Sequence, residues 1–172
     1  LVPHQGIHNA VEGGAAQASA APHGEAGKAA HGGGNNGPTF QQGATVDHAA
    51  NGFDPLAMLT EWDTGTLSVD ADGRTVRTFN VVAGEKEIEI APGVFFPAWT
   101  FNGRVPGPAF RAKEGERLRF RFSNGTTHPR TMHFHGIHSA FMDGVSGIGR
   151  GEILPGEEFT YEFTARPFGC HL

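Results

Sequence analysis

An all-β fold, either a sandwich or a Greek-key barrel, is predicted from three observations on this chain of 172 residues. Short segments alternate between apolar and polar residues, glycine and proline separate these segments, and no long amphipathic helix pattern occurs. Alternation with a period of two is typical of strands that bury one face and leave the other in water. Because only 38% of the residues are hydrophobic, we expect one domain rather than two independent cores.

The clearest predicted strand covers residues 117–122, with the sequence RLRFRF. Its arginines fall on one face, whereas Leu118, Phe120 and Phe122 fall on the other and are expected to pack in the core. Residues 159–163 alternate in the same way.

Two more strands are expected earlier in the chain, at residues 75–82 and around residues 88–90. Glycine-containing turns are predicted at Asp72–Gly73, at Ala83–Gly84 and at Pro155–Gly156. This spacing of strands and turns is typical of an antiparallel β-structure.

Residues 1–52 are predicted to be a disordered tail, and residues 53–172 the folded domain. The tail is dominated by glycine and alanine and lacks the apolar pattern that would offset the entropy of ordering a chain. The histidines of the tail would bind a metal only loosely. These histidines are His4, His8, His23, His31 and His48. At the start of the domain, residues 53–62 predict a short helix or turn with Asp54 as its N-cap and Pro55 in its first turn.

The charge and hydropathy of the chain argue against some classes of partner. A formal net charge of -5 and a pI near 6.0 disfavour a nucleic-acid partner, which would need a concentrated basic face. No apolar run approaches the roughly 18 residues needed to span a bilayer, so no membrane span is predicted. The single cysteine, Cys170, has no second cysteine with which to form a disulfide in this chain.

The strongest chemical signal is the segment Met132–His138, which reads MHFHGIH. Residues two apart on a strand share a face, so His133 and His135 are expected to present two imidazoles side by side. Met132 and Phe134 would then point into the opposite layer. Imidazole pairs suit copper or zinc, and we take copper as the best match, with exposed surface histidines as the alternative.

Two other histidines are candidates for the same metal site. Gly136 lets the backbone turn after His135, which would bring His138 toward the pair or carry it away. His128 lies shortly before the segment. Both are predicted only as additional ligands.

The ordered sequence around this pair resembles the first plastocyanin-like, or cupredoxin, domain of multicopper oxidases such as laccases. The resemblance is carried by residues 99–124, WTFNGRVPGPAFRAKEGERLRFRFSN, followed by TMHFHGIH, and it extends over most of residues 53–172. It implies a cupredoxin-like Greek-key fold that is incomplete at its C-terminal end. By the same resemblance, His133 corresponds to a ligand of the type 2 copper and His135 to a ligand of a type 3 copper, and Asp143 is a candidate to act behind these ligands.

The resemblance leaves the type 1 copper without a location. Family domains that hold it usually place a histidine three residues before the His-x-His pair, where this chain has Arg130, which lacks a lone pair to donate. His128 would serve only if the loop at Pro129 were rearranged. Cys170 is out of frame for a type 1 ligand, so we expect it, like His171, to have a structural role, with Cys170 as a small core residue.

The function implied by the resemblance is that of an oxidase that takes single electrons from a reducing substrate and reduces dioxygen to water. A second cupredoxin domain or a neighbouring subunit would complete the copper cluster, in an arrangement that allows a homotrimer, and this piece alone is expected to bind copper weakly without turnover. The family's habit implies a periplasmic or secreted protein. Two alternatives stay open: a copper nitrite reductase, whose ligand histidines are spaced as His133 and His138 are, and a non-catalytic electron-transfer cupredoxin.

Overall fold

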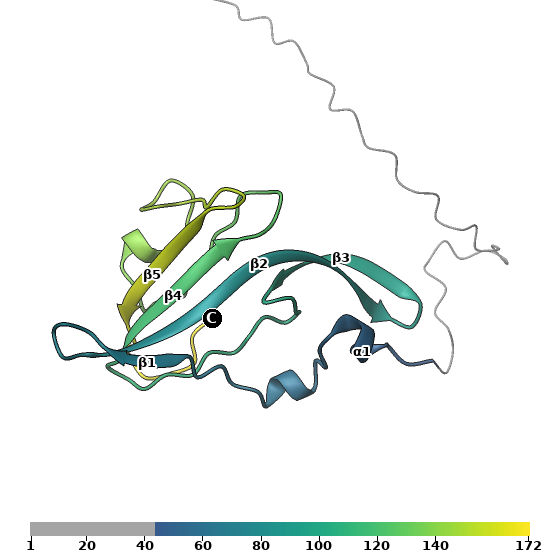
Figure 1. Cartoon of the computed structure of the whole chain (residues 1–172), viewed down its shortest axis with the longest axis horizontal. Helices are drawn as coiled ribbons and strands as arrows, with labels where there is room; N and C mark the ends of the chain where they lie inside the picture. The colour runs from purple at the N-terminus through teal and green to yellow at the C-terminus, as the bar shows by residue number, and fades with distance from the viewer. Residues whose placement is uncertain (1–43) are drawn as a thin grey trace, which may run out of the picture. The chain divides into compact units, whose positions relative to one another are not determined.

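The computed structural model describes residues 44–172, and Figure 1 shows their strands curling around a common core. The elements in chain order are α1 (His48–Asn51), a 3-10 helix (Ala57–Leu59), β1 (Thr66–Val69), β2 (Thr75–Ala91), β3 (Val94–Phe101), β4 (Arg117–Asn124), a second 3-10 helix (Ala140–Met142) and β5 (Glu158–Thr164). The all-β prediction is therefore confirmed. Most of the predicted tail, including His4, His8, His23 and His31, lies outside the described residues.

Strand β2 is the centre of the sheet. It pairs with β1 and β3 in antiparallel fashion and with β4 in parallel fashion, and β5 pairs with the far side of β4. The first half of the 17-residue β2 therefore belongs to the sheet with β4, whereas its second half extends with β3 as a long hairpin (Figure 1). Among residues 44–172, these five strands form a single sheet.

The predicted turn at Ala83–Gly84 is wrong, because β2 runs straight through these two residues. Gly84 is paired with Thr100 of β3, and the Thr100 hydroxyl donates a hydrogen bond of 3.1 Å to the Gly84 carbonyl. The chain turns instead at Pro92–Gly93, whereas the turns at Asp72–Gly73 and Pro155–Gly156 are present as predicted. Gly84 therefore lies inside a continuous strand and does not end it.

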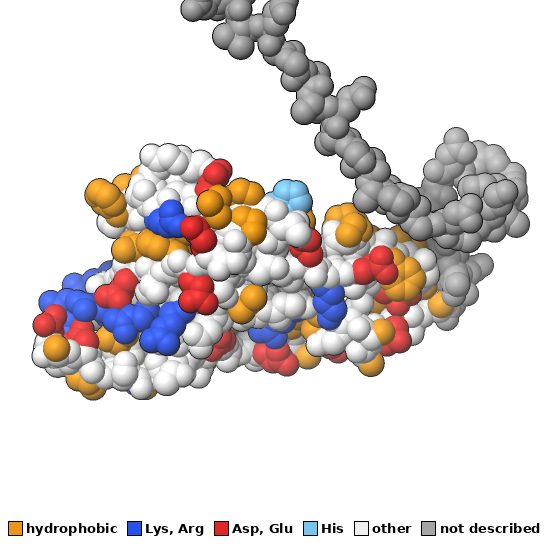
Figure 2. Space-filling view, turned by 45° about the horizontal axis from the view of Figure 1, so that its top comes forward, with side chains coloured by type: hydrophobic (Ala, Val, Ile, Leu, Met, Phe, Trp, Pro, Cys, Tyr) orange, Lys and Arg blue, Asp and Glu red, His pale blue; other side chains and the backbone are white. Residues whose placement is uncertain are grey.

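The core lies on one face of the sheet, against loops that follow β4. Leu118, Phe120 and Phe122 are buried, as the alternation of β4 predicts. They pack with buried side chains from β2, β5 and the loops, namely Phe79, Val81, Ala83, Met132, Phe134, Ile153, Tyr161 and Phe163. The β4 arginines lie on the opposite face, where Lys and Arg side chains gather near β1 (Figure 2), and Arg117 and Arg119 form ion pairs with Asp70 and Glu162.

One buried ion pair joins β2 to the loop before β4. The Arg77 guanidinium donates to both carboxylate oxygens of Glu116, at 2.6 and 2.9 Å, and also to the Thr64 carbonyl. The Lys113 backbone N–H adds a third donor to this carboxylate, at 2.9 Å. The hydrogen bond from Arg77 is the main reason that the pKa of Glu116 lies below its ordinary value, against the opposing effect of burial.

The N-terminal part of the described chain packs against the β2–β3 hairpin. Asn51 of α1 is buried, and its side-chain amide donates to the Glu89 carbonyl and accepts from the Glu89 N–H, each at 2.9 Å. The predicted helix near residues 53–62 is a single 3-10 turn, and Asp54 accepts a hydrogen bond from Leu56 N–H near its start. The domain boundary at residues 52 and 53 stays a prediction, although α1 already contacts β2. No helix of the described chain is long and apolar enough to cross a membrane.

Candidate metal centre

Residues 130–135 form the segment that carries the predicted ligands. Met132 and Phe134 are buried in the core, whereas His133 and His135 are exposed, so the predicted alternation is present. The segment is nevertheless not a paired strand of the sheet. Its backbone is held by a bridge between Arg130 and Ile153, by a hydrogen bond from Met132 N–H to the Tyr161 hydroxyl, and by one from His135 N–H to the Leu172 carbonyl.

The two imidazoles lie side by side at the surface. The ring centroids of His133 and His135 are 4.8 Å apart, and the ring planes are inclined by 65°. This separation follows from the alternation, since both side chains leave the same face of the segment. The side chain of His133 is 45% exposed, so an ion can reach it from solvent.

Asp143 fixes the ring of His133. The Nδ1 atom of His133 lies 2.8 Å from the Asp143 main-chain oxygen and 2.9 Å from its carboxylate oxygen Oδ1. Both neighbours are acceptors, so Nδ1 carries the proton, and Nε2 keeps its lone pair for a metal. A ligand histidine oriented by a carboxylate in this way is a common arrangement at metal sites.

His138 also lies in this region but is placed differently. Its ring centroid is 6.2 Å from that of His133, and its side chain is only 7% exposed. Its Nδ1 lies 3.0 Å from the Ser139 carbonyl, and its Nε2 faces the Phe134 carbonyl and, at 3.3 Å, the Asp143 carboxylate. Both ring nitrogens of His138 therefore face acceptor oxygens of the protein and not open solvent, and the geometry favours His133 and His135 over His138 as ligands.

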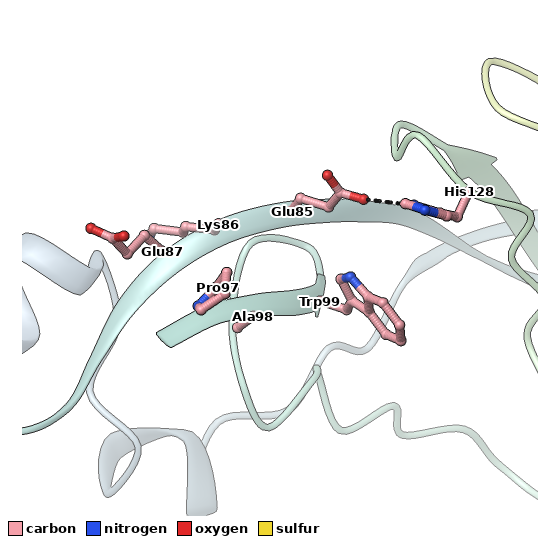
Figure 3. Close-up of a pocket in the computed structure, with 7 residues that line it drawn as sticks. All are labelled: Glu85, Lys86, Glu87, Pro97, Ala98, Trp99 and His128. Atoms are coloured by element: carbon pink, nitrogen blue, oxygen red, sulfur yellow. Dashed lines mark ion pairs between the residues drawn. The ribbon is translucent and has the colours of Figure 1, made fainter. Parts of the chain in front are cut away.

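His128 belongs to a different part of the surface. Its Nδ1 lies 2.9 Å from the Thr127 hydroxyl and 3.6 Å from the Glu85 carboxylate of β2 (Figure 3). Within residues 44–172, the ring contacts that join His133, His135 and His138 do not include His128. The structure therefore separates His128 from the imidazole pair.

Arg130 anchors the start of the ligand segment to β3. Its guanidinium carbon lies 3.8 Å from the centroid of the Trp99 ring, and its Nη2 lies 3.8 Å from the Glu85 carboxylate. The guanidinium thus takes up the space beside Trp99, and it has no lone pair to offer a metal.

Cys170 is exposed, so its prediction as a small core residue is wrong. His171 is exposed as well, and its Nε2 lies 3.0 Å from the Pro167 carbonyl. The backbone of this short surface segment is held by hydrogen bonds from Phe168 N–H to the Glu114 carboxylate and from His135 N–H to the Leu172 carbonyl.

Sequence reasoning missed Tyr161, whose hydroxyl accepts the Met132 N–H at 3.2 Å behind the ligand pair. The signal was present, because a tyrosine at a core position of a predicted strand needs a hydrogen-bond partner for its hydroxyl. Burial is the main cause of the raised pKa of Tyr161.

The donor set at the pair fits copper as a partial site. Imidazole nitrogen is a good copper ligand, and two of them on adjacent exposed positions provide two donors to neighbouring or shared ions. In residues 44–172, no cluster of three or more His, Cys, Asp or Glu side chains is arranged around one ion. Further donors would have to come from elsewhere.

Comparison with known proteins identifies the family of this chain. The family model described as multicopper oxidase matches residues 83–171. A solved multicopper oxidase superposes with a TM-score of 0.71 at 52% identity, covering 74% of this chain and 45% of that one. A multicopper oxidase from Pseudomonas thermotolerans superposes with a TM-score of 0.52 at 35% identity, covering 54% of this chain and 23% of that one.

Curated relatives are of the same kind and are much longer. Laccase-2 of Botryotinia fuckeliana is 35% identical over 77% of this chain and 24% of its own length. The copper resistance protein A homolog of Pseudomonas syringae pv. tomato is 35% identical over 58% of this chain and 17% of its own length. The chain thus spans a quarter or less of these two relatives. Since the family model covers more than half of the sequence and the fold agrees with it, this chain belongs to the multicopper oxidase family.

Proposed function

We propose that the full-length protein is a copper oxidase that couples one-electron oxidation of a reducing substrate to the reduction of dioxygen to water, and that His133 and His135 are copper ligands in it. The observation that carries the proposal is the imidazole pair, with ring centroids 4.8 Å apart and with His133 already oriented by Asp143. Bound copper would supply the redox chemistry, since it takes up and releases single electrons.

The protein's own part in this function is to present and hold the donors. The Asp143 oxygens keep the proton of His133 on Nδ1, so that Nε2 is free to bind a metal before the metal arrives. Met132 and Phe134 anchor the segment in the core, which restricts movement of the two imidazoles between them. A pair held in this way pays less ordering entropy on metal binding than two mobile side chains would.

We further propose that the remaining ligands come from a second cupredoxin domain or from a neighbouring subunit, as in a homotrimer. Two imidazoles leave the coordination of copper incomplete, and the relatives are longer than this chain. The present chain alone is expected to bind copper weakly and to show no oxidase turnover. An extracytoplasmic location fits this function.

The test is to replace His133 and His135 with Ala in the full-length protein and to measure copper per chain and oxygen uptake. Both should fall, and oxygen uptake should fall to background. His128→Ala is the matched control, because it removes an exposed imidazole away from the pair. If copper content and oxygen uptake of the double variant equal those of the wild type, the ligand assignment is wrong. Supplying nitrite in place of dioxygen in the same assay tests the nitrite reductase alternative.

A further inference from the structure

A shallow pocket on the β2–β3 hairpin is separate from the imidazole pair. Its volume is about 350 Å³. It is lined by Glu85, Lys86 and Glu87 of β2, by Pro97, Ala98 and Trp99 of β3, and by His128 (Figure 3). We refer to it as the Trp99 pocket.

Carboxylate and aromatic side chains share one face of the hairpin here. Glu85 is the cross-strand partner of Trp99, and Glu87 is the partner of Pro97, so all four side chains project to the same side. Trp99 itself is 66% exposed. An exposed indole on the same face as two carboxylates is an unusual surface, because large apolar side chains at a concave site generally contact a ligand or partner.

Glu85 is fixed in place and stays ionised. Its carboxylate accepts from the Thr127 hydroxyl at 3.1 Å and lies 3.6 Å from His128 Nδ1 and 3.8 Å from Arg130 Nη2. Burial is the largest single effect on the pKa of Glu85 and acts to raise it, but the interactions with Thr127 and His128 together outweigh it, and the pKa lies below its ordinary value.

In the described part of the chain, the cations near the pocket leave the Glu87 carboxylate without an ion pair. The Lys86 ammonium is directed away, to the Asn51 carbonyl and the ring of Phe53. The Arg130 guanidinium occupies only one face of the Trp99 ring. Among the described residues, Glu87 has no hydrogen bond or ion pair.

We propose that the Trp99 pocket binds a small organic ammonium ion, with the ammonium near the Glu87 carboxylate and the apolar part of the ligand against Pro97 and the free face of Trp99. An indole face and carboxylates together are the chemistry that recognises organic cations. The volume suits a ligand with a single ring. This site is independent of copper and of the oxidase function.

The test uses benzylammonium as the probe and uncharged benzyl alcohol as its matched control. The chain has two tryptophans, so Trp62→Phe makes Trp99 the only indole, and its fluorescence then reports on the pocket. The variant chain is titrated with each probe at constant ionic strength. Benzylammonium should bind about fivefold more tightly than benzyl alcohol.

Glu87→Gln should weaken benzylammonium binding about threefold and leave benzyl alcohol binding unchanged. Glu158→Gln is the control, because Glu158 is an exposed carboxylate on β5 outside the pocket. Melting temperatures of both variants establish that they remain folded. Equal affinities for the two probes, or benzylammonium binding that does not respond to Glu87→Gln, would overturn the proposal. Because neither measurement involves copper or oxygen, failure of this site is distinguishable from failure of the oxidase proposal.

Discussion

At the residue scale, the candidate metal centre depends on one contact, between His133 and Asp143. The His133 ring has two acceptors at its Nδ1 atom, the main-chain oxygen and the carboxylate of Asp143. The main-chain oxygen would hold the proton on Nδ1 even without the carboxylate. The carboxylate adds a second restraint on ring rotation and a negative charge that makes the imidazole a stronger donor.

We predict that Asp143→Ala lowers the copper affinity of the chain about tenfold, at the low end of the effect expected for such partners, because the main-chain oxygen remains. Asp143→Asn keeps an acceptor oxygen and should lose less. Copper titration against a competing chelator measures both, with the His133→Ala/His135→Ala variant as the blank for copper bound elsewhere on the chain. An unchanged affinity in Asp143→Ala would show that the carboxylate does not support the site.

The imidazole pair was predictable at this scale, and its surroundings were not. A period of two was enough to put His133 and His135 on one face. The contact of Arg130 with Trp99 and the separation of His128 depend on where a loop crosses the β2–β3 hairpin, which local pattern does not specify. The exposure of Cys170 likewise depends on the path of a surface segment and not on the residue type.

At the scale of elements, the loop after His138 determines where the ligand segment lies. Gly144 has a positive φ of 68°, and a Cβ atom placed on it would overlap the Met132 carbonyl oxygen and lie 2.8 Å from the carbonyl carbon. The backbones of this loop and of the ligand segment are therefore in direct contact, at the step between Met132 and His133.

We predict that Gly144→Ala destabilises the protein by about 1–3 kcal/mol more than Gly136→Ala does. Gly136 is the matched control because its φ is 77° and a Cβ atom there meets nothing within 4 Å, so only the conformational strain is shared. Urea unfolding of both variants gives the difference. Equal losses would mean that the close approach at Gly144 relaxes without cost.

Strand β2 shows what sequence patterns miss at this scale. The alternation on either side of Ala83–Gly84 predicts two separate strands. The structure joins them because Gly84 completes the ladder with Thr100 of β3, a partner that follows later in the chain. Pairing across strands, not local preference, decides whether such a glycine breaks a strand.

At the scale of the whole molecule, stability in acid depends on the buried ion pair of Arg77 and Glu116. The pKa of Glu116 is lowered, mainly by its hydrogen bond with Arg77, below the ordinary value of 4.5. Its contribution to stability is therefore complete above that ordinary value, and it is lost as the pH falls through the pKa of the folded state.

We predict that Glu116→Gln lowers the free energy of unfolding by about 3 kcal/mol near neutral pH, because it leaves a buried guanidinium without its counter-charge. The difference from the wild type should shrink steadily below about pH 4.5, where Glu116 of the unfolded chain becomes protonated while the folded state keeps it ionised to lower pH. Urea unfolding over a pH series measures it, and Glu87→Gln serves as the exposed control. A constant difference across the series would argue against an ionised pair.

The all-β class of the described residues was predictable because it follows from the alternation of apolar and polar residues. The parallel pairing of β2 with β4 was not, because parallel neighbours require a crossover that local turn signals do not encode. The chain crosses over through the hairpin formed by the second half of β2 and β3. This hairpin places the Trp99 pocket away from the core.

The parallel pairing has a consequence for synthesis on the ribosome. Val76 leaves the exit tunnel before Arg117, its partner in the ladder. At ordinary translation rates the interval between them is on the order of seconds. During that interval the edge of β2 that pairs with β4 has no hydrogen-bond partner from β4. A nascent chain of this kind is a natural client for chaperones, and slowing translation after β2 should increase its capture by them.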